Sequence, residues 1–188
     1  MAQFTSGGIN ILDIPKAILR KNIGIVLQDT KLFSGTIRDN ITYGTLSVTD
    51  KEIELAAKKA HANSFIERLP QKYDTYITSN RFSEGETQLI TIARTLLTSP
   101  PILILDEATS NIDLLTEYKI QQAFKVLIKN TTSFIIAHRL STIESADLIL
   151  YIENGNIAEK GTHKELLNKK GKYFELYHSQ FDDTPFSK

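Results

Sequence analysis

The chain has 188 residues, 41% of them hydrophobic and 23% charged, which fits a single folded domain rather than a disordered or coiled-coil chain. Its 22 basic and 22 acidic residues cancel, so no long-range field points to nucleic acid as a partner. Cysteine is absent, which excludes disulfides, thiolate metal sites and a cysteine nucleophile. The apolar runs fall far below the ~18 residues that span a bilayer, so we expect no direct membrane insertion.

Short apolar runs alternate with stretches of helical period, which predicts an α/β fold on a mostly parallel sheet. Four strands are expected from these runs, at residues 23–27, 102–105, 133–137 and 148–152. Each run is apolar at successive positions, the pattern of strands that helices cover on both faces. Asn154 and Gly155 form a type I′ turn signal, so the last strand should pair with residues 156–159 in an antiparallel hairpin. The sheet is therefore expected to be mixed at that end.

Helix starts are marked by capping boxes, in which a Ser or Thr side chain and a Glu three residues later satisfy each other's free amides. The pattern occurs at Thr49/Glu52, Ser83/Glu86, Ser141/Glu144 and Thr162/Glu165. Apolar residues recur at helical spacing behind the first two boxes, which predicts core-facing helices. The residues expected in the core are Ile53, Ala56, Ala57, Ala60, Phe65, Leu89, Ile92, Ala93 and Leu96.

Two further signals bound the later helices. Pro100 and Pro101 are expected to end the second helix, and Asp113 to cap a third helix from Leu114 to about Lys129. We interpret residues 1–180 as one domain and residues 181–188 as a flexible tail.

Asp106 and Glu107 follow directly on the predicted strand at residues 102–105. Ligands of open α/β sheets gather beyond the carboxyl ends of the strands. A carboxylate there can hold a hydrated Mg²⁺, and its neighbour can orient or deprotonate a water. For an Asp-Glu pair taken alone, capping of the turn after the strand is the more common role.

Three more segments carry candidate ligand contacts. Gln28 and His138 follow two other predicted strands, where an amide could bind a metal or water and an imidazole could contact a phosphate oxygen. Ser83 and Gly85 open a helix whose first amides are free to bind an anion. The competing interpretations are a packed histidine satisfied by the backbone and an ordinary capping box.

Together these motifs resemble the nucleotide-binding domain of ATP-binding cassette (ABC) transporters, over about residues 5–180. Residues 24–41 are similar to the Q-loop segment of exporter-type cassettes. Other segments resemble further family motifs: Walker B at residues 102–107, the D-loop at 110–113, the H-loop at 137–141, and the following segment of the same exporters at 155–167.

The resemblance implies a P-loop NTPase-like sheet with helices on both faces, a helical signature subdomain at about residues 45–98 and a C-terminal antiparallel hairpin. It also implies ATP and Mg²⁺ as cofactors. The roles that it implies are Mg²⁺ binding for Asp106 and Gln28, general base for Glu107 and γ-phosphate contact for His138. The other cofactor-binding positions implied are Gln28, Ser83, Gly85, Glu86 and Asp113, of which Ser83 and Gly85 face the ATP of a second cassette in a head-to-tail dimer.

The function that the resemblance implies is that of a cassette that couples ATP binding and hydrolysis to transmembrane transport. Its partners would be a second cassette and the transmembrane domain of an exporter, with no nucleic acid. The location implied is the cytoplasmic face of the cell membrane, where the cassette is peripheral and held through a transmembrane partner or domain.

The phosphate-binding G-x-x-x-x-G-K-[ST] pattern does not occur in this sequence. At the only Gly-Lys pair, Gly171-Lys172, Leu166 stands in place of the first glycine and Tyr173 in place of Ser or Thr. We therefore expect the chain to match the C-terminal two thirds to three quarters of the domain and to begin after the P-loop. By itself it should bind Mg·ATP poorly and show no steady turnover.

The signature pattern L-S-G-G-Q reads Phe82-Ser-Glu-Gly-Glu86 in this chain. Glu84 and Glu86 therefore place two carboxylates where a phosphate would approach the helix. An alternative interpretation is a non-catalytic or degenerate cassette fragment that acts only as a partner-binding remnant, so the sequence leaves ATPase activity open. A soluble cassette of repair or translation is disfavoured, because residues 32–40 resemble exporters specifically.

Overall fold

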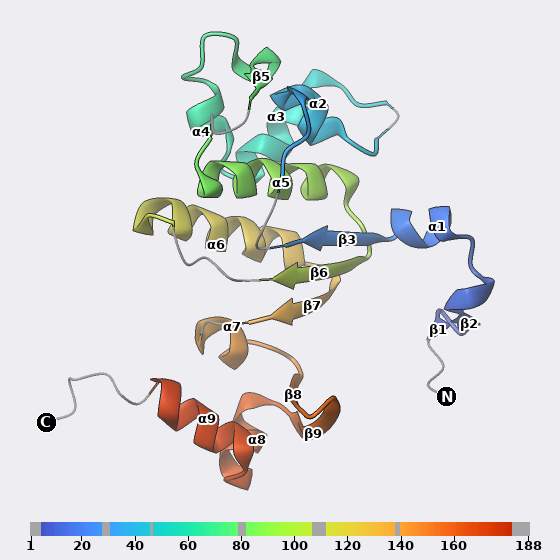
Figure 1. Cartoon of the computed structure of the whole chain (residues 1–188), viewed down its shortest axis with the longest axis vertical. Coiled ribbons are helices and arrows are strands. Elements are labelled where there is room, and N and C mark those ends of the chain that lie inside the picture. The colour runs from blue at the N-terminus through green and yellow to red at the C-terminus, as the bar shows by residue number, and fades with distance from the viewer. Residues whose placement is uncertain are drawn as a thin grey trace, which may run out of the picture. The chain divides into compact units, whose positions relative to one another are not determined.

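The structure, a computed structural model, describes residues 5–27, 31–45, 47–78, 82–106, 112–137 and 140–181 (Figure 1). The chain divides into two compact units, Met1–Ile136 and Ala137–Lys188, and each is described by itself. The assignment of residues 1–180 to one domain stays a prediction.

A three-stranded parallel sheet forms the centre of the first unit, in the order β3-β6-β7. The strands are β3 (Ile23–Val26), β6 (Ile102–Asp106) and β7 (Thr132–Ile136). Each agrees with its predicted range to within one residue at either end. The register pairs Val26 with Leu105 and Asp106 with Ile136, so the three carboxyl ends meet at one edge of the sheet. The predicted α/β fold with a parallel sheet and an antiparallel hairpin is confirmed.

Helix α5 (Glu84–Thr98) lies between this sheet and a layer of shorter helices (Figure 1). That layer contains α2 (Ile37–Thr42), α3 (Asp50–Lys59) and α4 (Asn63–Ile66). On the sheet side, α5 contacts β3 and α6 (Leu114–Ile128). The helix is therefore buried on opposite sides along most of its length.

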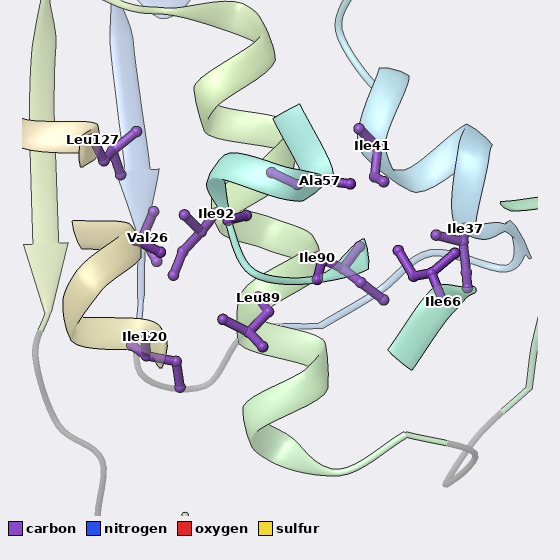
Figure 2. Packing of buried hydrophobic residues seen from close by; sticks show 14 of the residues in the cluster. Val26, Ile37, Ile41, Ala57, Ile66, Leu89, Ile90, Ile92, Ile120 and Leu127 are labelled. Atoms are coloured by element: carbon purple, nitrogen blue, oxygen red, sulfur yellow. The ribbon is translucent and has the colours of Figure 1, made fainter. Parts of the chain in front are cut away.

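The two sides of α5 carry different core residues (Figure 2). Ile90 lies beside Ile41 and Ile66 of the short-helix layer, whereas Ile92 lies beside Val26 of the sheet. Seven of the nine predicted core residues are buried, and Phe65 and Leu96 pack against the same cluster partly buried, so the helical spacing located the core correctly.

One face of the sheet is covered less than the sequence predicted. Val26, Leu103 and Leu105 belong to the core cluster formed with α5 and α6. On the other face Ile25, Phe134 and Ile136 are 51%, 59% and 56% exposed. The expected cover by helices on both faces is therefore incomplete among the described residues of this unit. Such a contiguous apolar surface promotes association.

Several short elements of the first unit were not predicted, because two to six residues carry too little periodicity to be recognised. They are β1 (Thr5–Ser6), β2 (Ile9–Asn10), η1 (Ile11–Asp13), α1 (Lys16–Lys21), β4 (Gly35–Thr36), η2 (Lys72–Asp74) and β5 (Tyr76–Ile77). Strand β1 pairs with β2, and β4 pairs with β5, both antiparallel.

The second unit contains α7 (Leu140–Glu144), β8 (Ile149–Glu153), β9 (Asn156–Gly161), α8 (His163–Lys169) and α9 (Lys172–Phe181). Strands β8 and β9 form the predicted hairpin, and Asn154 and Gly155 have the positive φ angles, 50° and 75°, of a type I′ turn. The hairpin is a sheet of its own in the described residues, so the prediction of one mixed sheet is wrong there. Phe181 still belongs to α9, and the rest of the predicted tail lies outside the described residues.

Three predicted capping boxes are confirmed, at Thr49, Ser83 and Thr162. The box at Ser141 is wrong, because α7 already includes Leu140, so Ser141 lies inside the helix instead of preceding it. A further box at Thr36 and Asp39 begins α2. It uses an aspartate at the third position, which a search for glutamate alone does not find.

Arg94 of α5 joins the helix to the segment before and inside α2. Its Nε donates to the backbone oxygen of Asn40 at 2.7 Å, and its Nη2 donates to Asn40 Oδ1 at 3.0 Å. Asn40, 1% exposed, also accepts from the Phe33 amide at 2.8 Å and donates to the Phe33 oxygen at 2.9 Å. The guanidinium lies 4.9 Å from the centre of the Phe33 ring, which adds a cation–π contact. This arrangement fixes the segment from Phe33 to Asn40 onto α5.

We predict that Asn40→Ala lowers the free energy of unfolding by about 1–3 kcal/mol, because the part-buried hydrogen bonds that the Asn40 side chain makes with Phe33 and with Arg94 Nη2 are lost. Urea unfolding of the purified variant measures this. Asn63→Ala is the matched control. Asn63 is the first residue of α4, and this helix start has no side-chain capping hydrogen bond that the change could remove. Equal losses in the two variants would contradict the role of Asn40.

Candidate functional site

Asp106 is the last residue of β6, the middle strand of the parallel sheet. It is paired with Ile136 of β7 and is partly exposed at the carboxyl edge of the sheet. The position agrees with the prediction that Asp106 stands where an α/β sheet holds its ligands. Gln28, Glu107 and His138 lie outside the described residues, so their roles stay predictions.

The described residues contain no group of three or more His, Cys, Asp or Glu placed to hold a metal ion. Of the two predicted Mg²⁺ ligands, Asp106 belongs to the described residues and Gln28 does not. A single carboxylate suits Mg²⁺, which keeps several waters and is held by one or two carboxylates together with substrate phosphates.

The start of α5 carries Ser83 and Glu86 in a closed capping box. Ser83 Oγ accepts from the Glu86 amide at 3.2 Å, and the Ser83 amide donates to Glu86 Oε2 at 3.0 Å. Among the described residues, the exposed Ser83 hydroxyl has no acceptor for its own proton. The Ser83 amide, by contrast, already serves the Glu86 carboxylate. An anion that needs this amide must displace Glu86.

Gly85 is buried, and its lack of a side chain has a packing reason. A Cβ at this position would lie 2.4 Å from Thr116 Cγ2 and 3.1 Å from Ile112 Cγ2. Real side chains do not approach so closely, so α5 and the start of α6 fit together only with glycine here. The sequence suggested a close approach to phosphate at Gly85, and the contact with Thr116 could not be seen without the fold.

Asp113 caps α6, as the sequence predicted. Its Oδ1 accepts from the Thr116 amide at 3.0 Å, and hydrogen bonding from Thr116 lowers the pKa of the carboxyl. Thr116 thus contacts both the cap at Asp113 and the glycine of α5. The structure therefore brings two predicted cofactor-binding segments, around Gly85 and at Asp113, to one place.

Gln88, one turn beyond Gly85, is a residue that the sequence reasoning missed. Its side chain is 3% exposed, and its Nε2 has no hydrogen-bond partner in the part of the chain that the structure describes. Buried polar groups without partners are rare, and each calls for an explanation. The signal that could have identified it is a glutamine within the apolar stripe of a helix.

We predict that Gly85→Ala lowers the free energy of unfolding by about 1–3 kcal/mol, because the added methyl group overpacks the contact with α6. Thr116→Ser removes the methyl group that the new Cβ would meet and keeps the hydroxyl. The double variant should therefore recover part of the loss in a urea titration. If Gly85→Ala is as stable as the parent chain, the α5–α6 contact is not as tight as the structure indicates.

No helix among the described residues combines the length and the apolar character needed to cross a membrane.

Comparison with known proteins places these features in context. Residues 2–110 match the ABC transporter family. The chain is 56% identical over 177 residues to the uncharacterized ABC transporter ATP-binding protein YfiC of Bacillus subtilis, with 93% of this chain and 29% of that protein covered. It is 51% identical over 180 residues to a putative multidrug export ATP-binding/permease protein of Staphylococcus aureus (strain NCTC 8325), with 95% and 31% covered.

A solved structure gives the same likeness in three dimensions. A bacterial Atm1-family ABC exporter with ATP bound matches with a TM-score of 0.86 and 41% identity, over 97% of this chain and 32% of that one. The chain spans about three tenths of the length of the relatives that it matches.

Proposed function

This chain belongs to the ABC transporter family, and from that premise we propose that it couples ATP binding and hydrolysis to export across a membrane. The observation that carries the proposal is the edge of the parallel sheet. Strands β3, β6 and β7 end side by side at Val26, Asp106 and Ile136. In the sequence Gln28, Glu107 and His138 follow these ends by one or two residues.

In the proposed reaction each of these residues has a separate task. Asp106 would hold a hydrated Mg²⁺, and Glu107 would accept a proton from the attacking water. His138 would contact the γ-phosphate, and Gln28 would contact the metal and the water. Bound Mg²⁺ would supply neutralisation of the charge on the phosphates.

The signature segment faces a second cassette in this proposal. Ser83, with its free hydroxyl proton, and Gly85, Glu86 and Asp113 lie at the adjoining starts of α5 and α6 and would contact the nucleotide held by the partner. Two features weaken this contact. Glu86 occupies the Ser83 amide, and Glu84 adds an exposed negative charge to the same turn. We therefore propose that this signature serves a weak or inactive ATP site.

The partners follow from the same proposal. A second cassette completes the nucleotide site, and an exporter's transmembrane domain docks on the segment that begins at Gln28. The chain would then act at the cytoplasmic face of the membrane, held through that domain. The observation that favours docking near this segment is the stacked pair Phe33 and Tyr43, 46% and 58% exposed and backed by Arg94.

A graft tests the proposed reaction. This chain replaces the matching 180-residue segment of the Staphylococcus aureus relative, and the purified protein is assayed for ATP hydrolysis and ATP binding. We predict that Glu107→Gln lowers kcat by about 10²-fold or more, the scale of general-base catalysis, with little change in ATP affinity.

Glu54→Gln, on the exposed side of α3, is the matched control and should leave kcat unchanged. The assignment of Glu107 is wrong if its variant keeps full turnover. A graft that binds no ATP, beside an active unmodified relative, would instead favour the non-catalytic fragment.

The altered signature gives a separate prediction in the same graft. Glu84→Gly with Glu86→Gln should raise the ATPase rate and lower the ATP concentration needed for half-maximal rate. The change removes two charges that repel phosphate in a poorly hydrated contact. Glutamine can still accept from the Ser83 amide, so the capping box remains. If both kinetic constants stay unchanged, these carboxylates do not face a nucleotide.

A further inference from the structure

The segment Glu159-Lys-Gly-Thr-His163 connects β9 to α8, and its side chains contact three other elements of the second unit. Thr162 caps α8 through the Glu165 amide, and Gly161 has a φ of 157°. These local features make His163 the first residue of α8. The two ends of the segment, Glu159 and His163, make the long-range contacts.

Glu159 anchors the start of α9. Its side chain is buried, with Oε1 accepting from the Lys172 amide at 3.0 Å and Oε2 from the Tyr173 amide at 3.1 Å. A carboxylate at this end of a helix is favoured by the helix dipole. A Cβ on Gly171 would lie 2.0 Å from Glu159 Oε1, so the anchor requires glycine at that position. The anchor determines where the side chains of α9 point.

Tyr173, on the first turn of α9, contacts His163. Its hydroxyl lies 2.8 Å from His163 Nδ1, and burial raises the pKa of the phenol, so it keeps its proton at neutral pH. With the imidazole proton on Nε2, Tyr173 donates to Nδ1 and the Nε2 hydrogen faces the carboxylate of Glu144. The distance from His163 Nε2 to Glu144 Oε1 is 3.7 Å.

Glu144, the last residue of α7, receives a second contact on the same oxygen. The Tyr177 hydroxyl donates to Glu144 Oε1 at 3.2 Å, and the Tyr177 ring lies 5.2 Å from the His163 ring, centre to centre. Helix α7 has five residues, too few to be stable without tertiary contacts. The contacts of Glu144 therefore decide where the end of α7 lies against α8 and α9.

We propose that Glu144, His163, Tyr173 and Tyr177, here named the Glu144 network, position α7 for the reaction. Helix α7 begins at Leu140, two residues after His138 in the sequence. The network holds the last residue of this short helix, Glu144, to α8 and α9. Glu159 in turn anchors the start of α9. The inference rests on the proposed function, in which His138 contacts the nucleotide. Its members are positioning residues and do not contact the nucleotide themselves.

Hydrogen exchange of the 188-residue chain tests the physical part of this inference. Tyr177→Phe removes one hydroxyl and keeps the ring, and His163→Gln removes the imidazole. Each should speed amide exchange in α7 by about tenfold, the change expected from losing one hydrogen bond to a charged acceptor, with α5 unaffected. His61→Gln, in the loop after α3, is the matched control and should leave α7 unchanged.

Kinetics of the graft test the functional part. Tyr177→Phe and His163→Gln should each lower kcat by roughly tenfold or less and leave the KM for ATP within about twofold, since ground-state binding is retained. Glu144→Gln keeps an acceptor for Tyr177 and should retain more activity than Glu144→Ala. If the network had a purely structural role, the variants would lower the thermal midpoint of unfolding but would not lower kcat selectively with KM unchanged.

Each outcome decides the question. Unchanged exchange in α7 overturns the inference. Faster exchange with an unchanged kcat also overturns it, provided that His138→Ala lowers kcat in the same graft. If His138→Ala leaves kcat unchanged, the proposed role of His138 has failed, and the catalytic part of the inference fails with it while the exchange result stands.

Discussion

Helix α5 is buried on opposite sides at once, and α2, α3, α6 and β3 are packed against it. The sheet side receives Ile92, and the short-helix layer receives Ile90 (Figure 2). A helix in this position cannot shift toward one layer without opening a gap in the other, because protein interiors are close-packed. Gly85 against α6 and Arg94 against α2 fix the two ends of the same helix.

A helix buried on both sides must also satisfy its polar side chains from within. Thr91 and Thr95 are 5% exposed, and each hydroxyl donates to the backbone oxygen four residues earlier, at 3.2 and 3.0 Å. Gln88 differs, because a longer amide cannot bond back in this way and its Nε2 finds no partner among the described residues. The unsatisfied amide lies one turn from Gly85. Among the described residues of α5, the unmet hydrogen-bonding capacity thus lies near the start of the helix.

Local patterns predicted much of this fold, and contacts distant in sequence account for most of the rest. The capping box at Thr49 and the turn at Asn154 depend on neighbouring residues, so short sequence segments were sufficient. The bonds from Arg94 to Asn40 cross 54 residues, and no local pattern announces them. Ser141 was misassigned for a related reason: a Ser followed by Glu at the right spacing does not exclude a helix that starts one residue earlier.

Glu86 shows how stability and ligand binding compete at one helix start. Its carboxylate accepts from the Ser83 amide and its charge suits the helix dipole, so it stabilises the fold. The same amide and the same positive end of the dipole are what an approaching phosphate would use. A neutral glutamine can complete the capping box without repelling the phosphate. Glutamate also completes the box, but its negative charge repels the phosphate. Because Gly85 and α6 fix this turn in place, the helix cannot tilt to relieve that opposition. The carboxylate itself must move before an anion can bind there.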